Sequence, residues 1–521
     1  MAGTDLEQEQ AEETESIPEE ARGDRRMVTA ALMLAMAVTA LEQLVVSTAM
    51  PSIIAELHGL DVYSWVTSAY LLTATVTTPI YGKLADLWGR KRVLLFGLAL
   101  FALGSMLSGM ATSMTGLIAM RALQGLGAGA VGPIVLTMIG DLFTLEERAK
   151  VQGLFSGIWG VSSVAGPALG GVLTDQLSWR WVFYVSVPFA ALSAWILARH
   201  VDEEREHREV LPIDWSGAAL LSAGSTALLV AVMQGNEQSM ARGVALLATA
   251  FVLFVLLIWR ERRAADPILP LDLLANVPIA AAIGGSFLIG GLLFGIDTFL
   301  PLFIQGVQGG TATAAGRTIT PLFLAWAISV TIAAKVVVRL GFRTTALIGS
   351  VSIALGVLGL ALGTVWPSVS GRMFLAGLLL IGTGMGPTSL SYILGVQSAV
   401  SWGRRGAATG AVLFFRTMGG AMGVGILGAT LIMALGRRLA AARASGIDVA
   451  AALRPETHRL LSSHELHVVQ EALGRSLRDV FLQMFALSLL VIVLSALLQA
   501  GRADAAVKGD DDLEYAHDHF A

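Results

Sequence analysis

Four charged side chains lie inside long apolar stretches of this sequence: Glu42, Arg121, Asp297 and Arg416. A charge within a membrane-spanning helix costs about 2.5–3.5 kcal/mol on insertion scales, so each is expected to have a partner, a water-filled cavity or a function. The sequence has no recognisable Ser/His/Asp set, and it lacks cysteine altogether. These residues therefore suit the binding and release of protons or charged groups within a membrane, rather than catalysis, and we expect no enzyme and no bound metal.

Glu42 and Arg121 are expected to lie at a similar depth. Glu42 is about eight residues from the end of the first apolar stretch, and Arg121 is about six residues into the fourth. With a helical rise of 1.5 Å per residue, these positions are about 12 and 9 Å from the same surface. Burial favours a neutral carboxyl and a nearby arginine favours a charged one, so the pair is suited to proton coupling. The alternative is an ion pair that only holds two helices together.

Asp297 and Arg416 allow more than one interpretation. Asp297 is about seven residues from the end of the ninth apolar stretch, and Arg317 opens the tenth on the same side. A local salt bridge and a role in proton coupling both fit Asp297. Arg416 either stabilises an anionic group or pairs with backbone carbonyls. We predict a substrate cavity with these lining residues, although each also suits packing or contact with lipid: Gln124, Trp159, Trp326, Phe415, Arg416 and Met418.

The composition indicates what must position these residues. Hydrophobic residues make up 55% of the 521 and charged residues 14%, which excludes a soluble globular protein. The charges separate apolar stretches of about 20 residues, the length that crosses roughly 30 Å of hydrocarbon as a helix. We therefore predict an all-α polytopic membrane protein with fourteen transmembrane helices. The acidic residues 1–26 do not resemble a cleavable signal peptide.

Basic residues indicate the orientation. They gather in the segments that fourteen spans would place on the side of the two termini, so we predict cytoplasmic termini. The segment 437–477 is the exception, because it is rich in arginine and yet falls on the opposite side. We predict that it is a partly helical periplasmic element between spans at 406–436 and 478–500.

A weak internal repeat divides the chain into two halves. Residues 335–343 resemble residues 83–91, with Val338 in the place of Asp86. The predicted division is a cytoplasmic tail at 1–26, a six-helix bundle at 27–200, a linker with two inserted helices at 201–276, a second six-helix bundle at 277–500 and a cytoplasmic tail at 501–521.

The charged segment at 82–92 resembles a known signature. Gly82, Asp86, Gly89 and Arg90 match the pattern G-x-L-a-D-r-x-G-r-k, in which Leu87 replaces the usual arginine. This pattern is typical of the cytoplasmic loop between helices 2 and 3 in the major facilitator superfamily.

Three further motifs resemble those of the drug:proton antiporters with fourteen spans in that superfamily. Glu42 takes the place of the aspartate in the helix 1 pattern L-D-x-T-V-V-N-V-A-L-P, and Arg121 begins R-x-x-Q-G-x-G in helix 4. Helix 5 is similar to the antiporter motif G-x8-G-x3-G-P-x-x-G-G, with Ser162 at its second glycine. The matching positions of that motif are Gly153, Gly166, Pro167, Gly170 and Gly171.

The resemblance implies the major facilitator fold and multidrug efflux from the bacterial inner membrane, a source of antibiotic resistance. The cargo would be a small amphipathic, cationic or lipid-like compound exchanged for protons within the lipid membrane. No ATP-binding motif occurs, so the proton gradient is the expected energy source and no cofactor is expected. We expect a monomer without nucleic-acid partners. A lipid exporter of the same fold is the first alternative, and a non-transporting membrane sensor the second.

Overall fold

The computed structural model describes residues 19–143, 158, 161–162, 165–201, 214–233, 240–263, 271–366, 370–400, 405–441 and 462–500. Within these residues every regular element is helical, which confirms the predicted all-α fold. Ten of the described helices are long and apolar enough to cross a membrane. The longest of these helices is counted once, although it is long enough for two spans. Ten is therefore not the number of spans, and the total of fourteen stays a prediction.

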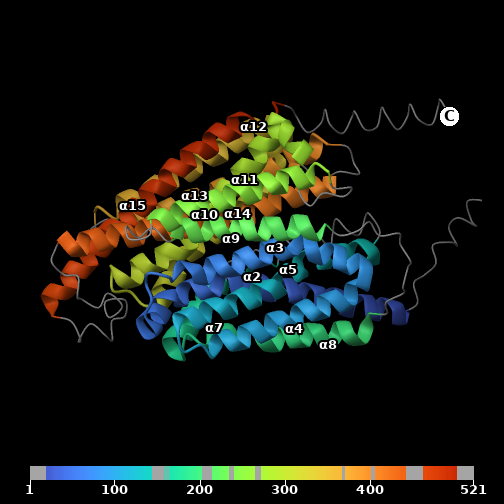
Figure 1. Ribbon diagram of the computed structural model, residues 1–521, viewed down its shortest axis with the longest axis horizontal. Coiled ribbons are helices and arrows are strands. Elements are labelled where there is room, and N and C mark those ends of the chain that lie inside the picture. Colours follow the sequence, from blue (N-terminus) through green and yellow to red (C-terminus); the bar gives the residue numbers. More distant parts are fainter. Residues whose placement is uncertain are drawn as a thin grey trace, which may run out of the picture.

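The N-terminal half forms one bundle (Figure 1). Glycines allow α5 to pack closely on its neighbours, since a Cβ at Gly127 would collide with the backbone of Phe101 and one at Gly125 with that of Tyr70. The first half comprises α2 (Glu19–Leu57), α3 (Ser64–Trp88), α4 (Arg90–Gly109), α5 (Met114–Leu142), the helical residues 165–176, α7 (Trp181–Tyr184) and α8 (Ser186–His200).

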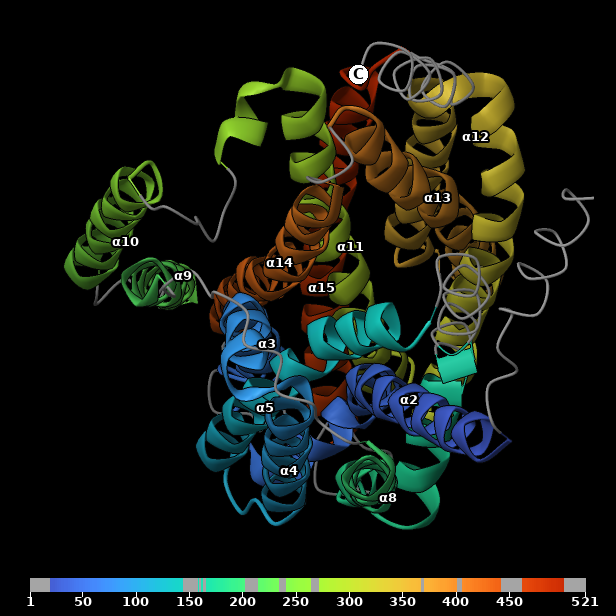
Figure 2. The ribbon, with the colours of Figure 1, turned by 90° about the vertical axis from the view of Figure 1, so that its right-hand side faces the viewer.

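Two helices between the halves form a separate pair. These are α9 (Trp215–Met233) and α10 (Met240–Glu261), which lie beside the bundles in Figure 2. Asp214 accepts hydrogen bonds from Ser216 Oγ at 2.6 Å and Gly217 N at 3.0 Å, and it pairs with Arg260 at 3.1 Å. Burial alone raises the pKa of Asp214, but these hydrogen bonds and the Arg260 charge together lower it below its usual value.

The C-terminal half begins after η2 (Leu271–Ala275). Its longest helix, α12, has 52 residues and a non-helical Gly341 at φ 79° and ψ 169°. At 1.5 Å per residue α12 is about 78 Å long, more than twice the hydrocarbon thickness, so it comprises two spans joined at Gly341. The helices are α11 (Val277–Gly306), α12 (Ala312–Gly363), α13 (Ser370–Ser398), α14 (Arg405–Ala441) and α15 (Ser463–Ala496).

The predicted element 437–477 is helical at both of its described ends. The helix α14 continues to Ala441, and α15 begins at Ser463, so 466–477 belongs to α15. Residues 442–461 lie outside the described part of the chain. A capping box starts α15: Ser462 donates to Glu465 Oε2 from its hydroxyl at 2.7 Å and its amide at 2.8 Å, and these bonds lower the pKa of Glu465.

Candidate functional site

The structure places Glu42 and Arg121 in contact. Arg121 Nη1 lies 3.2 Å from Glu42 Oε1, and both side chains are buried, with 2% and 0% of their surface exposed. The same nitrogen donates to Gln124 Oε1 at 2.6 Å, and Arg121 Nε donates to the Val66 carbonyl at 3.4 Å. The ion pair therefore joins α2 to α5, at the shared depth that the sequence predicts.

Aromatic rings cover this ion pair. The Arg121 guanidinium carbon lies 4.1 Å from the centroid of the Tyr70 ring and 5.8 Å from that of Phe183. A desolvated cation over such rings gains up to about 2 kcal/mol, which offsets part of the cost of its burial. Glu42 Oε2 and Gln124 Nε2 are buried and make no hydrogen bond with another described residue. One carboxylate oxygen therefore has an ionic partner, whereas the other is available to a proton.

Asp297 in α11 has a different kind of partner. Its side chain is 2% exposed, and its Oδ1 accepts a hydrogen bond from Ser47 Oγ of α2 at 2.9 Å. This bond joins the two halves of the molecule. At the next residue of α2, the carbonyl of Thr48 accepts a hydrogen bond from Gln305 Nε2 of α11 at 2.9 Å. Within the described residues Asp297 forms no salt bridge with Arg317, so the alternative of a local ion pair has no support from the structure.

Further contacts between the halves lie at the same end of the molecule, where α12 begins. Asp175 of the first half accepts hydrogen bonds from the amides of Ala312 at 3.1 Å and Thr313 at 2.8 Å. The side chain therefore caps a helix of the other half and places a negative charge at its N-terminus. Neither Asp175 nor Gln305 is among the residues predicted from the sequence; the position of Asp175 just beyond the helix 5 glycines was the available signal.

The helix 5 glycines pack against both halves. A Cβ at Gly166 would lie 2.8 Å from Leu44 Cβ of α2, and one at Gly170 would collide with the Val45 carbonyl. On the other side, a Cβ at Gly171 would lie 2.5 Å from the Cα of Thr313 in α12. Gly316 of α12 abuts the carbonyl of Pro167 in the same way. Residues 165–176 are thus held between α2 and α12, while Gly153 lies outside the described residues.

The signature loop depends on a glycine conformation. Gly89 lies between α3 and α4 with φ 92° and ψ 144°, a region that is essentially reserved for glycine. Gly82 has open space around its Cα, so it is not required there by packing. Asp86 and Arg90 lie in α3 and α4 on either side of Gly89, and the side chain of Asp86 is outside the described part.

The residues predicted for the cavity lie in different packing clusters. Gln124 belongs to the buried ion pair, and Met418 packs among Tyr70 and its neighbours. Trp326 stacks on Phe323, with ring centroids 6.5 Å apart. Phe415 packs beside α9 and α10, Arg416 is half-buried in α14, and Trp159 lies outside the described residues.

Both the sequence and the fold of this chain are similar to those of known proteins. The family model of the Major Facilitator Superfamily matches residues 32–424. Multidrug resistance protein 3 of Bacillus subtilis (strain 168) is 36% identical over 406 residues, which cover 77% of this chain and 79% of that protein. Multidrug transporter protein MdtP of the same organism is 37% identical over 412 residues, 78% of this chain and 75% of MdtP.

A solved structure shows the same fold. It is a bacterial homologue of the human lysosomal transporter Spinster, in an inward-facing and unoccupied conformation. The TM-score is 0.66 at 14% sequence identity, and the match covers 91% of this chain and 98% of the other. At this identity the likeness concerns the fold alone.

Proposed function

Because this chain belongs to the Major Facilitator Superfamily, and is thus a multi-pass membrane transporter and not an enzyme, we propose that it is a proton-coupled exporter. Its cargo in this proposal is a small amphipathic or cationic drug-like compound, moved outward by alternating access of the two bundles. The named multidrug relatives support this substrate class. We also propose that the chain has fourteen spans, that twelve of them form two six-helix bundles, and that it lies in the inner membrane with both termini in the cytoplasm.

One observation carries the proposal: Glu42 is a fully buried carboxylate with one oxygen on Arg121, and its other oxygen has no hydrogen-bond partner among the described residues. When Glu42 is charged, the ion pair holds α2 to α5. A proton on the free oxygen removes that charge and weakens the attraction to Arg121. The two protonation states thus favour different arrangements of α2 and α5, which is the requirement for coupling proton binding to a conformational change.

Asp297 extends this scheme to the boundary between the halves. Its carboxylate accepts the Ser47 hydroxyl across that boundary. In the proposed orientation this bond and the Asp175 cap lie at the outer end, so the described conformer is closed to the outside. Protonation of Asp297 removes the negative charge that attracts the Ser47 hydroxyl, and the outer contact weakens. Loss of the Asp297 charge thereby favours opening of the outer end.

The test of the proposed function is transport by purified protein in proteoliposomes. A panel of cationic dyes is added with an imposed proton gradient, and internal pH and dye movement are followed together. We expect dye movement to require the gradient and to end when an uncoupler is added. Dye movement that is unaffected by an uncoupler would contradict proton coupling.

The proposed orientation has its own test. Because the chain has no native cysteine, a single cysteine at Ser463, an exposed residue at the start of α15, is the only thiol. An impermeant maleimide should label it in intact spheroplasts. Labelling only after lysis would place this end of α15 in the cytoplasm and overturn the fourteen-span topology.

A second candidate function is lipid export, which the length of α15 favours. Its 34 residues are about 51 Å long, so roughly 20 Å extends beyond the hydrocarbon. An ion pair between Arg438 and Asp479 at 2.6 Å ties α14 to α15 near this extension. Such an extension suits a shielded path for an acyl chain. Deletion of residues 442–461 should abolish export of lipid, whereas export of small dyes should continue.

A further inference from the structure

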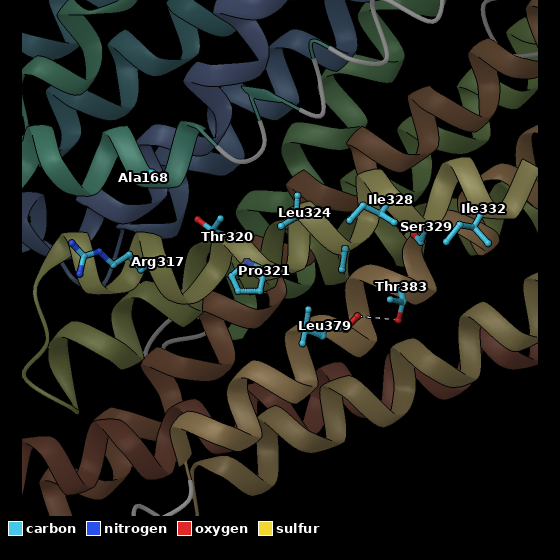
Figure 3. Close-up of a pocket in the computed structure, with 11 residues that line it drawn as sticks. Ala168, Arg317, Thr320, Pro321, Leu324, Ile328, Ser329, Ile332, Leu379 and Thr383 are labelled. Atoms are coloured by element: carbon cyan, nitrogen blue, oxygen red, sulfur yellow. Dashed lines mark hydrogen bonds between the residues drawn. The ribbon is translucent and has the colours of Figure 1, made fainter.

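A groove of about 550 Å³ runs along α12 at the boundary between the two halves (Figure 3). Ala168 of the first half lies at one end, and the other described residues that line the groove come from α12 and α13 of the second half. From Arg317 to Ile332 the groove follows sixteen residues of α12, about 22 Å, which is more than half of the hydrocarbon thickness.

The groove opens toward the surroundings of the protein and is almost entirely apolar. Leu324, Ile328 and Ile332 are 49%, 54% and 57% exposed, and Leu379 on the opposite wall is 42% exposed. The few hydroxyl groups are already used, since Ser329 donates to the Gly382 carbonyl at 3.0 Å and Thr383 to that of Leu379 at 2.9 Å. In a membrane, such a surface accepts hydrocarbon.

Among the described residues that line the groove, only Arg317 is charged, and it lies at one end. Arg317 lies six residues after the N-cap of α12, so its Cα is about 9 Å from the helix terminus. The side chain is exposed, and within the described residues it forms no ion pair or hydrogen bond. From this depth an arginine reaches the headgroup layer with its guanidinium while its stem follows the apolar surface. A planar guanidinium in that layer favours phosphate, which it can bind through two parallel hydrogen bonds.

We propose that this groove binds one anionic phospholipid of the membrane, with its phosphate on Arg317 and an acyl chain along Leu324, Ile328 and Ile332. A cation at the surface end and a hydrocarbon-lined channel below it match the two parts of such a lipid. The site does not depend on which compounds the protein exports. Because Ala168 and α12 belong to different halves, a lipid seated here contacts both, and its binding depends on how the halves are arranged.

The experiment uses full-length protein in phosphatidylcholine bilayers with a trace of photoactivatable phosphatidylglycerol that carries a diazirine in its acyl chain. After irradiation, label is quantified by peptide mass spectrometry on residues 320–332 of α12 and on α10. The helix α10 is a control within the same molecule, since it also has an exposed arginine, Arg242, near its start and an exposed apolar face that includes Phe251 at 70%.

We expect α12 to carry several times more label than α10. One cation near the membrane surface contributes about 1 kcal/mol with an anionic lipid, so phosphatidylglycerol should label α12 about five-fold more than photoactivatable phosphatidylcholine does. Arg317→Gln should remove this preference, and Arg242→Gln should leave it unchanged. Equal labelling of α12 by the two lipids, or an unchanged preference in Arg317→Gln, would overturn the proposal.

A second variant tests the groove separately from the charge. Thr320→Leu fills part of the groove and loses only a bond to the Gly316 carbonyl within α12. We expect it to reduce labelling of residues 320–332 by both lipids while labelling of α10 stays constant. If Thr320→Leu labels like the wild type, the lipid is not seated in the groove.

Discussion

The two halves each bury a carboxylate in helices that the internal repeat pairs, α2 and α11, but they surround it differently. Glu42 has a charged partner within its own half, Arg121 at 3.2 Å. Asp297 has a neutral partner from the other half, Ser47 at 2.9 Å. Protonation of Glu42 therefore changes an ion pair inside one bundle, whereas protonation of Asp297 changes a contact between bundles. In the proposed cycle, the first half would load the proton and the second half would control the outer contact.

The same two halves are alike in the backbone of their helix hairpins. Gly89 and Gly341 both have positive φ angles, 92° and 79°, at matching positions of the repeat. Asp86 lies three residues before Gly89 in the first half. The corresponding residue of the second half, three residues before Gly341, is Val338, which carries no charge. The turn geometry is thus retained in both halves, whereas the charged signature is not.

The largest expected effect is that of Glu42→Gln. The amide oxygen can still accept a hydrogen bond from Arg121, but the amide cannot bind and release a proton, so proton-driven export should fall by roughly 100-fold or more while substrate binding is retained. Proteoliposomes that report internal pH and dye together measure both properties. Wild-type proton exchange in this variant would remove Glu42 from the coupling role.

A smaller effect is expected for Asp297→Asn. The amide oxygen still accepts the Ser47 hydroxyl, but the contact no longer responds to protons, so we expect turnover to fall about ten-fold with proton exchange still coupled through Glu42. Ser47→Ala is the matched control, because it removes the bond and keeps the carboxylate. A loss in Asp297→Asn as complete as in Glu42→Gln would show that the two acids are equivalent.

The fold, the family and the common depth of Glu42 and Arg121 could be predicted from the sequence. The apolar stretches and motifs predicted the helical fold and the family, both now confirmed, and the 1.5 Å rise placed Glu42 and Arg121 at one depth. The partner of Asp297 was not predictable, because Ser47 is 250 residues away and their approach depends on how the two bundles tilt. The same reason hid the Asp175 contact with α12. Proton coupling and the identity of the substrate stay predictions.

Replacement of the two glycines with positive φ, Gly89 and Gly341, is expected to lower the stability of the fold. Gly89→Ala and Gly341→Ala should each destabilise the fold by about 1–3 kcal/mol, because alanine is strained at both backbone conformations. Thermal unfolding in detergent measures the change, with Gly82→Ala as the control at a site with open space. If Gly341→Ala unfolds like the wild type, the two hairpins do not share the same backbone requirement.

The smallest effect is expected outside the two bundles, at Asp214. Asparagine still caps α9 but lacks the charge that attracts Arg260, whose side chain is 35% exposed, so the loss should be at most about 1 kcal/mol at neutral pH. The folded pKa of Asp214 is lowered, so its contribution is present above the unfolded pKa of about 3.9 and is lost as the pH falls through the folded pKa.

The measurement is thermal unfolding of the wild type and Asp214→Asn across this pH range. The two unfolding temperatures should differ most near neutrality and converge in acid. A constant difference at all pH values would mean that the charge of Asp214 does not contribute to stability. The ion pair of Asp214 with Arg260 would then differ from that of Glu42 with Arg121, in which the charge is expected to matter.

The Asp175 cap has a consequence for the speed of the transport cycle. In the alternating-access cycle that we propose, the outer ends of the bundles separate, and the amides of Ala312 and Thr313 must then leave the Asp175 carboxylate. Loss of side-chain hydrogen bonds to the amides at a helix N-terminus costs about 0.5–2 kcal/mol. If that cost falls within the opening step, it slows opening by roughly two-fold to thirty-fold. In that proposed cycle, a side chain that touches neither cargo nor proton would set part of the interval between successive export events.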